Sequence, residues 1–197
     1  MQTQIADTAL IVIVLVDVDG EFTCAHEELE SFNGIKFGHV SGDFYCLNNR
    51  LKSLEGAPQS VGGTFDCQRN NLKTLEGSPK AVGEDFYCWS NPLESLIGAP
   101  ESIGGTFNFN DELSVPEGRW SFKYLSYLFE TLEGKDKKLV GTLLSPKALQ
   151  KRIDENPSAA AIELKGILHL PQYKDLKWPA HLRDKVVLLK DLGDIGA

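Results

Sequence analysis

The sequence predicts an α+β protein, in which a β-solenoid of about five rungs is followed by a small helical domain. Three similar segments, each near 21 residues, follow one another at Leu51–Asn71, Leu72–Pro92 and Leu93–Asp111. Repeats of this length are typical of solenoids, where each repeat packs on its neighbours. Within each segment the order Phe-x-Cys, or Phe-x-Phe in the last, places two side chains on one face of a short strand. After Pro116 the repeat stops and the spacing of apolar residues becomes helical.

The rungs are centred on phenylalanines. These residues are 21 apart from Phe44 onward, whereas Phe22 precedes Phe44 by 22, which places one extra residue within Ile35–His39. Because alternate residues of a strand share a face, each phenylalanine and the residue two positions later point inward. We therefore expect a buried, stacked ladder of Phe22, Phe44, Phe65, Phe86 and Phe107, with Cys24, Cys46, Cys67, Cys88 and Phe109 beside them.

The order Phe-x-Cys-x-x-Asn-x-Leu resembles the leucine-rich-repeat pattern L-x-L-x-x-N/C-x-L, with Phe and Cys in the first two leucine positions. The longer motif L-E-G-A-P…V-G-G…F-x-C-x-x-N is similar to leucine-rich-repeat proteins of bacteriophages and bacteria, over residues 1–118. The resemblance implies strands on a concave face, a convex return segment and a habit of binding other proteins, and it implies no catalytic residue. Asn49, Asn70 and Asn91 hold the asparagine position, where we expect each amide to bond the backbone of its own turn and of the next rung.

The four cysteines predict buried thiols and no cofactor. An even count allows disulfides or a zinc site, but the gaps between successive cysteines all exceed 20 residues, unlike the close pairs of zinc sites. Equivalent positions in successive rungs favour small, buried, reduced side chains, which suit a cytoplasmic location. The apolar run Ala9–Val16 is too short to cross a bilayer, and no Lys or Arg precedes it, so we expect neither a membrane segment nor a secretory signal.

Three parts are expected: a capping strand in residues 1–16, the solenoid in 17–118 and a helical C-terminal domain in 119–197. The stretch Leu10–Val18 is apolar on both faces and predicts a doubly buried strand covering the first rung, with a short helix as the alternative. Lys135, Lys137 and Lys138 are expected in a solvated loop. Four helices are expected from apolar spacing and capping residues, at Trp120–Leu132 with Gly134 as its end, Ser145–Asp154, Ser158–His169, and Trp178–Leu192.

Charge divides at the same boundary as the repeats. Residues 1–118 hold 6 Lys and Arg against 18 Asp and Glu, a net charge of −12, and residues 119–197 hold 14 against 10, a net charge of +4. An acidic solenoid is poorly suited to nucleic acid, whose phosphates attract Lys and Arg. The asymmetry favours a protein partner with a basic surface.

The outward positions of the strands form the predicted binding face. Tyr and Trp are typical anchors of protein interfaces, and carboxylates around them suit a basic partner. Two alternatives stay open: these aromatics have high strand propensity, and the helical domain could fold over them. The candidate contact residues are Asp43, Tyr45, Leu47, Asp66, Asp85, Tyr87 and Trp89.

The leading functional prediction is a non-enzymatic protein–protein interaction module in the cytoplasm. The resemblance to phage proteins extends this to a phage-encoded module directed at a host protein, in the host cytoplasm. One alternative is an acidic DNA mimic that inhibits a nucleic-acid enzyme. Another is an enzyme with a site in the helical tail, although no histidine has metal-type spacing and no nucleophile motif is present. The sequence does not specify an oligomeric state.

Overall fold

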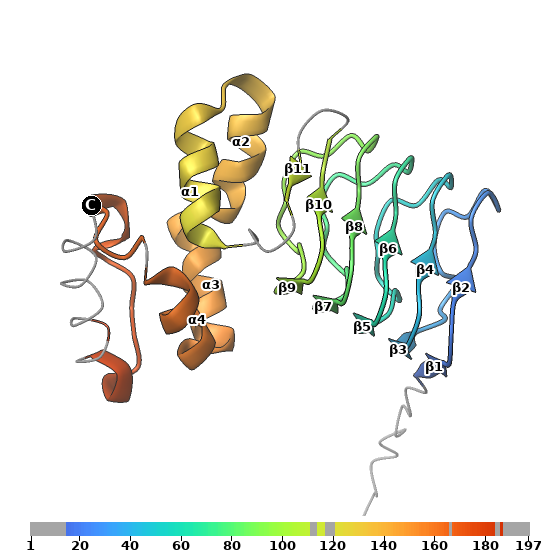
Figure 1. Cartoon of the computed structure of the whole chain (residues 1–197), viewed down its shortest axis with the longest axis horizontal. Helices are drawn as coiled ribbons and strands as arrows, with labels where there is room; N and C mark the ends of the chain where they lie inside the picture. Colours follow the sequence, from blue (N-terminus) through green and yellow to red (C-terminus); the bar gives the residue numbers. More distant parts are fainter. Residues whose placement is uncertain (1–14, 111–113, 117–120, 166, 184–185, 187–197) are drawn as a thin grey trace, which may run out of the picture.

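Two sheets, parallel except for one antiparallel edge strand, form the walls of a β-solenoid in the computed structural model, which describes residues 15–110, 114–116, 121–165, 167–183 and 186 (Figure 1). The short sheet has the order β1-β3-β5-β7-β9, with β1 at Val16–Val18, β3 at Phe37–Val40, β5 at Ser60–Val61, β7 at Ala81–Val82 and β9 at Ser102–Ile103. The long sheet has the order β11-β10-β8-β6-β4-β2, with β2 at Phe22–Thr23, β4 at Phe44–Tyr45, β6 at Phe65–Asp66, β8 at Phe86–Tyr87, β10 at Phe107–Asn108 and β11 at Ser114–Val115. The predicted solenoid and its period are confirmed, and the short sheet is an additional element.

The strand register follows the repeat. In the long sheet Phe44 lies opposite Phe65, and Phe65 opposite Phe86, all in parallel pairs. In the short sheet Val16 pairs with Phe37 but Val18 pairs with Val40, so β3 holds one residue more than β1 between these pairs. The extra residue expected within Ile35–His39 is therefore confirmed as a bulge in β3.

The phenylalanine ladder is the centre of the core. Phe65 stacks on Phe44 with 5.5 Å between ring centroids and on Phe86 with 5.4 Å. Phe107, which continues the stack, is fully buried like these three. Phe22 is only half-buried, in contrast to the prediction, because the first rung has a neighbour on one side alone. Offset aromatic stacking thus adds to the burial of apolar surface along the solenoid.

The cysteines form a second ladder beside the phenylalanines and are free thiols. Cys46, Cys67 and Cys88 are buried, and burial raises their pKa well above the ordinary value, which keeps them protonated and unreactive. Cys24 is half-buried in the first rung, so the expectation of four fully buried thiols is wrong for this residue. Burial also raises the pKa of Cys24, to about 11.

An asparagine ladder closes each turn after the long sheet. The Nδ2 group of Asn70 donates to the carbonyl oxygens of Cys67 in its own turn, at 3.1 Å, and of Cys46 in the preceding turn, at 3.0 Å. Its Oδ1 accepts from the backbone N–H of Leu51, also in the preceding turn. Asn91 makes the equivalent bonds to Cys67, Cys88 and Leu72. The expected hydrogen bonds between turns are present, but each asparagine side chain bonds to the preceding rung and not to the next one.

The N-terminal strand differs from its prediction. β1 pairs with β3 as the first strand of the short sheet, and it is not a cap over the first rung. Val16 is 43% exposed, so the part of Leu10–Val18 that the structure describes is not buried on both faces. Residues 1–14, which hold most of the predicted cap, lie outside the described residues.

After the solenoid, the described residues form α1 at Phe122–Thr131, α2 at Gly134–Leu143, α3 at Pro146–Glu155 and α4 at Pro157–Leu164, with a short 3₁₀ helix at Pro171–Tyr173. The N-cap Ser145 of α3 is confirmed, whereas Asn156 and not Ser158 caps α4. Gly134 begins α2 instead of ending the preceding segment, so Lys135, Lys137 and Lys138 lie on a helix and not in a loop. Of the predicted last helix, Trp178–Leu192, only residues 178–183 and 186 are described, and 180–183 and 186 of these are helical.

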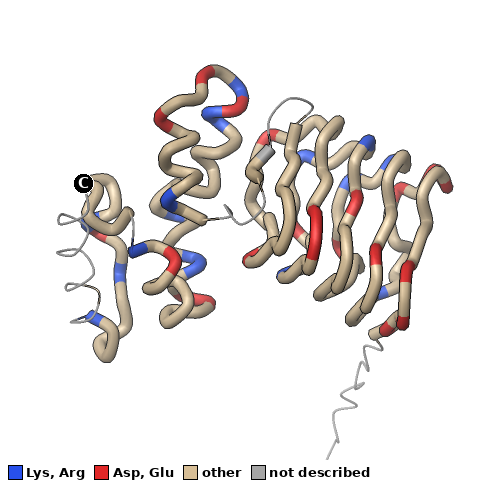
Figure 2. Tube along the Cα trace, in the orientation of Figure 1, with Lys and Arg blue, Asp and Glu red and all other residues tan. Residues whose placement is uncertain are grey.

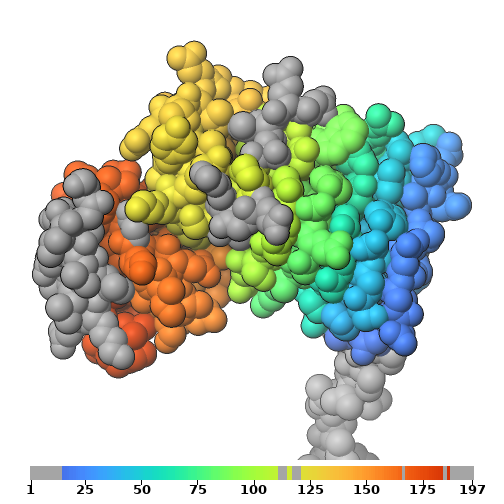
Figure 3. Space-filling model, in the orientation of Figure 1, coloured from blue at the N-terminus to red at the C-terminus, as the bar shows by residue number. Residues whose placement is uncertain are grey.

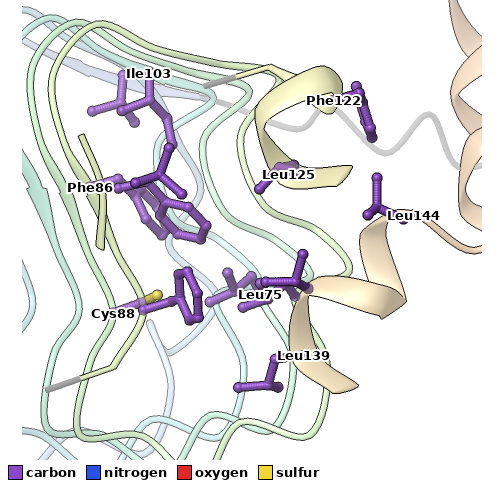
Figure 4. Close-up of a cluster of buried hydrophobic side chains, with 14 of the residues drawn as sticks. Leu75, Phe86, Cys88, Ile103, Phe122, Leu125, Leu139 and Leu144 are labelled. Carbon is purple, nitrogen blue, oxygen red and sulfur yellow. The ribbon is translucent and has the colours of Figure 1, made fainter. Parts of the chain in front are cut away.

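The helices close the C-terminal end of the solenoid. The backbone N–H of Leu96 donates to Thr142 of α2, and Asn110 donates to Asp136 at 2.8 Å. Figure 4 shows Leu125 of α1 and Leu139 of α2 on the side of the helices that faces the solenoid core. The buried residues of solenoid and helices form one continuous cluster. In the described part of the chain, no helix has the length and apolar character needed to cross a membrane.

Candidate binding face of the long sheet

The outer face of the long sheet has a repeat of two turns that is visible in the sequence. β4 and its flanks read Asp-Phe-Tyr-Cys-Leu, β6 reads Thr-Phe-Asp-Cys-Gln, β8 reads Asp-Phe-Tyr-Cys-Trp and β10 reads Thr-Phe-Asn-Phe-Asn. The inward Phe and Cys positions keep the 21-residue period, but the outward residues alternate from turn to turn. The face therefore carries two equivalent Asp-x-Tyr units, at β4 and β8, separated by a different turn at β6.

Each unit has the same internal geometry. The hydroxyl group of Tyr45 donates to Oδ2 of Asp43 at 2.9 Å, and that of Tyr87 donates to Oδ2 of Asp85 at 2.7 Å. These hydrogen bonds, with burial as the smaller cause, raise the pKa of each tyrosine to about 12. Both tyrosines consequently stay protonated at neutral pH and hold their partner carboxylates in a fixed orientation. We define Asp43 with Tyr45, and Asp85 with Tyr87, as the two Asp–Tyr units.

The aspartates of these units also bind the next turn. Oδ1 of Asp43 accepts from the backbone N–H of Thr64 at 2.7 Å, and Oδ1 of Asp85 accepts from that of Thr106 at 2.6 Å. A Cβ atom at Gly63 would overlap Oδ1 of Asp43, and the equivalent holds at Gly105 and Asp85.

The intervening turn supports the view that Gly63 and Gly105 leave space for the aspartate oxygens. Thr64 takes the place of the aspartate there, and Glu84 takes the place of the next glycine, with 3.5 Å between the threonine hydroxyl and the Glu84 carboxylate. Gly63 and Gly105 are thus supporting residues that the repeat alone did not identify. The alternation of Gly-Gly-Thr with Gly-Glu-Asp in the sequence is the signal that could have found them.

Asp66 lies between the two units, opposite Tyr45 on one side and Tyr87 on the other. It is only 6% exposed, so it is not the surface carboxylate that the register predicted. Its oxygens accept from the backbone N–H of Gln68 at 2.9 Å and from the Gln68 side chain at 2.7 Å. Burial raises its pKa, and these two bonds act in the opposite direction. Asp66 therefore offers little direct contact area on the face.

Trp89 lies at the border of the face. The guanidinium group of Arg69 sits 5.2 Å from the centroid of the Trp89 ring, within the range of a cation–π contact. Arg69 has a φ of 53°, in the left-handed region, and Asn48 and Ser90 have the same conformation in the neighbouring turns. The side chains of Leu47 and Trp89 are half-buried, and so are those of Tyr45 and Tyr87. These candidate residues therefore keep part of their surface accessible to a partner.

All charged residues at the outward positions of the face are acidic. Its fifteen outward positions in the five turns hold four carboxylates and no Lys or Arg. Figure 2 shows acidic segments on successive turns of the solenoid. Part of the acidic charge elsewhere is paired: Arg50 with Glu28, Lys52 with Glu30 and Lys73 with Glu94, all in loops that follow the long sheet.

Two cavities lie where the helices meet the last turns. One of about 190 Å³ is lined by Phe122, Leu125 and an ion pair between Arg152 and Glu163 at 2.8 Å. Arg152 also donates to the carbonyl oxygen of Glu101, so this side chain connects α3 with the solenoid. The other, of about 330 Å³, lies beside Phe109 and Leu139. Among the described residues no group of three or more His, Cys, Asp or Glu could hold a metal ion.

Figure 3 shows the solenoid and the helical region as one continuous surface, with the solenoid turns side by side. Comparisons of the chain with protein-family models, with curated proteins and with solved structures gave no match. The resemblance to leucine-rich-repeat proteins of phages and bacteria therefore stays a prediction.

Proposed function

We propose that the protein is a non-enzymatic protein-interaction module, which binds a partner with a basic surface through the outer face of the long sheet. The observation that carries this proposal is the pair of Asp–Tyr units, each held in one geometry by hydrogen bonds. Preorganised aromatic and charged side chains lose little conformational entropy on binding, which favours affinity. The absence of Lys and Arg from the outward positions of the five turns supports a cationic partner.

The two alternatives receive less support. A DNA mimic requires an unbroken row of accessible carboxylates, but Asp66 is buried, and Thr64 and Thr106 occupy the positions equivalent to Asp43 and Asp85 in the other turns. An enzyme in the helical tail requires a polar cavity with free catalytic groups. The polar groups of Arg152 in the smaller cavity are instead used to join the helices to the solenoid. A phage-encoded module acting on a host protein in the cytoplasm remains the biological setting we propose.

The proposal predicts that aromatic residues of the face are needed to capture the partner. We expect the double variant Tyr87→Ala/Trp89→Ala to lose at least tenfold in capture from lysate of the source cells, about 1.4 kcal/mol. Tyr127→Ala is the matched control, because Tyr127 lies on α1 and is 59% exposed. Quantitative mass spectrometry of the captured proteins provides the measurement, after thermal unfolding has shown that each variant is folded.

A partner is defined by this experiment as a protein that the wild type and Tyr127→Ala retain and the double variant loses. Equal capture by the wild type and the double variant would move the contact to another surface, with the basic helical region as the next candidate. Loss of the Tyr87–Asp85 hydrogen bond and of the Arg69–Trp89 contact is expected to cost roughly 1 kcal/mol each in stability, so the variants stay folded.

A further inference from the structure

The two-turn repeat of the face sets a distance that a partner contacting both Asp–Tyr units has to match. Successive strands of a sheet are about 4.8 Å apart, so β4 and β8, which are separated by β6 alone, are about 9.6 Å apart. Asp43 and Asp85 occupy equivalent positions on these strands, and so do Tyr45 and Tyr87. A ligand that contacts both Asp–Tyr units in the same way must itself repeat at about this distance.

We propose that the partner presents an α-helix that runs across the strands of the long sheet, with basic side chains seven positions apart. This inference rests on the proposed function of the face. Residues seven apart on a helix lie on the same side, and their separation along the axis is about 10.5 Å. That distance is within about 1 Å of the spacing between the two units.

Other regular segments fit less well. Residues on one face of an extended strand are about 6.7 or 13.4 Å apart, and neither value matches 9.6 Å. Helix positions three or four apart are separated by about 4.5 to 6 Å, which corresponds to neighbouring turns of the solenoid. There the outward residue changes from Asp43 to Thr64, so a basic side chain would meet a carboxylate only at every second contact.

The charge and the apolar residues of the face agree with this partner. Asp43 and Asp85 each accept two hydrogen bonds, and a carboxylate has room for further donors. Leu47 and Trp89 follow the units at the same two-turn spacing. Leu47 offers an apolar contact beside the first cation, and the Trp89 ring already contacts the Arg69 guanidinium group. Asp66 is buried between the units and does not block them.

The test uses synthetic Ala-based helical peptides of about 20 residues, a length at which isolated helices form. One peptide carries two Lys seven positions apart, and the other carries the same residues with the two Lys four positions apart. Fluorescence anisotropy with the full chain, at low ionic strength to limit screening, measures the affinities. We expect the first peptide to bind at least tenfold more tightly. Asp43→Asn and Asp85→Asn should each abolish this preference.

Glu55→Gln is the matched control, because it removes the same charge at an exposed position outside the long sheet and should keep the preference. Asparagine can still accept the bond from the next turn, so the aspartate variants retain the fold, which circular dichroism verifies. Equal affinity for both peptides, weakened by Asp85→Asn, would overturn the helix inference and leave the face as a cation-binding surface. Binding of neither peptide, or binding that both aspartate variants leave unchanged, would overturn the helix inference too. Whether the face binds a protein at all is decided separately by the capture experiment with Tyr87→Ala/Trp89→Ala.

Discussion

Phe65→Ala is expected to destabilise the protein by about 3 to 5 kcal/mol, the range for removing a fully buried phenylalanine. Phe65 is at the middle of the ladder, and its ring stacks on Phe44 and Phe86 at 5.5 and 5.4 Å. Its removal leaves a cavity with a ring on either side, and the parallel strand pairs on both sides of β6 prevent the turns from closing over it. Urea unfolding followed by circular dichroism measures the effect.

Phe22→Ala is the control for this prediction. Phe22 is half-buried at the end of the same ladder, where it stacks on Phe44 at 5.3 Å. Because part of its ring already faces water, its loss is expected to cost roughly 1 to 2 kcal/mol. A cost for Phe65→Ala no larger than that for Phe22→Ala would show that the ladder does not hold the solenoid together.

Asn70→Ala is expected to cost at least about 3 kcal/mol, because each buried polar group left unpaired costs about 1 to 3 kcal/mol. Asn70 is 5% exposed, and its side chain satisfies the carbonyl oxygens of Cys46 and Cys67 and the N–H of Leu51. Asn70→Asp should also destabilise, since a carboxylate accepts from Leu51 but cannot donate to the two carbonyl groups. Thermal and urea unfolding of both variants provide the measurement.

Asn71→Ala serves as the comparison, because Asn71 is the adjacent residue of the same type and is exposed. Its replacement is expected to change the free energy of unfolding by less than about 0.5 kcal/mol. If Asn70→Ala proved as mild as Asn71→Ala, the asparagine ladder would be a consequence of the fold and not one of its supports.

The repeat made the solenoid predictable, because the spacing of phenylalanines fixes both the strands and their register. The bulge in β3 could be located for the same reason, from a single extra residue. The short sheet escaped prediction because its strands have two to four residues, with at most two buried side chains each, which is too short for a periodic pattern. α2 was missed because its first residues, Gly134 to Lys138, are those of a typical loop and gain their helical conformation from packing at Leu139 and Val140.

The candidate face was predictable in outline and not in detail. Alternation along a strand shows that Tyr45, Asp66 and Tyr87 point away from the ladder, but it does not show how far they lean toward their neighbours. The hydrogen bonds from Tyr45 to Asp43 and from Tyr87 to Asp85 fix that orientation, and Asp66 becomes buried between them. The hydrogen bonds join residues two positions apart in one turn, and the burial of Asp66 depends on its neighbours in the two adjacent turns. The alternation of inward and outward positions predicts neither of them.

The central claim is that the partner contacts the outer face of the long sheet. Site-specific photo-crosslinking in the complex with the captured partner tests this most directly. The crosslinker is placed in turn at Leu47 on the face, at the exposed Gln59 beside the short sheet, and at Ile162, which is 70% exposed on α4. The account predicts a covalent adduct with the partner from position 47 and none from positions 59 and 162. Adducts from position 59 or 162, with none from position 47, would contradict it.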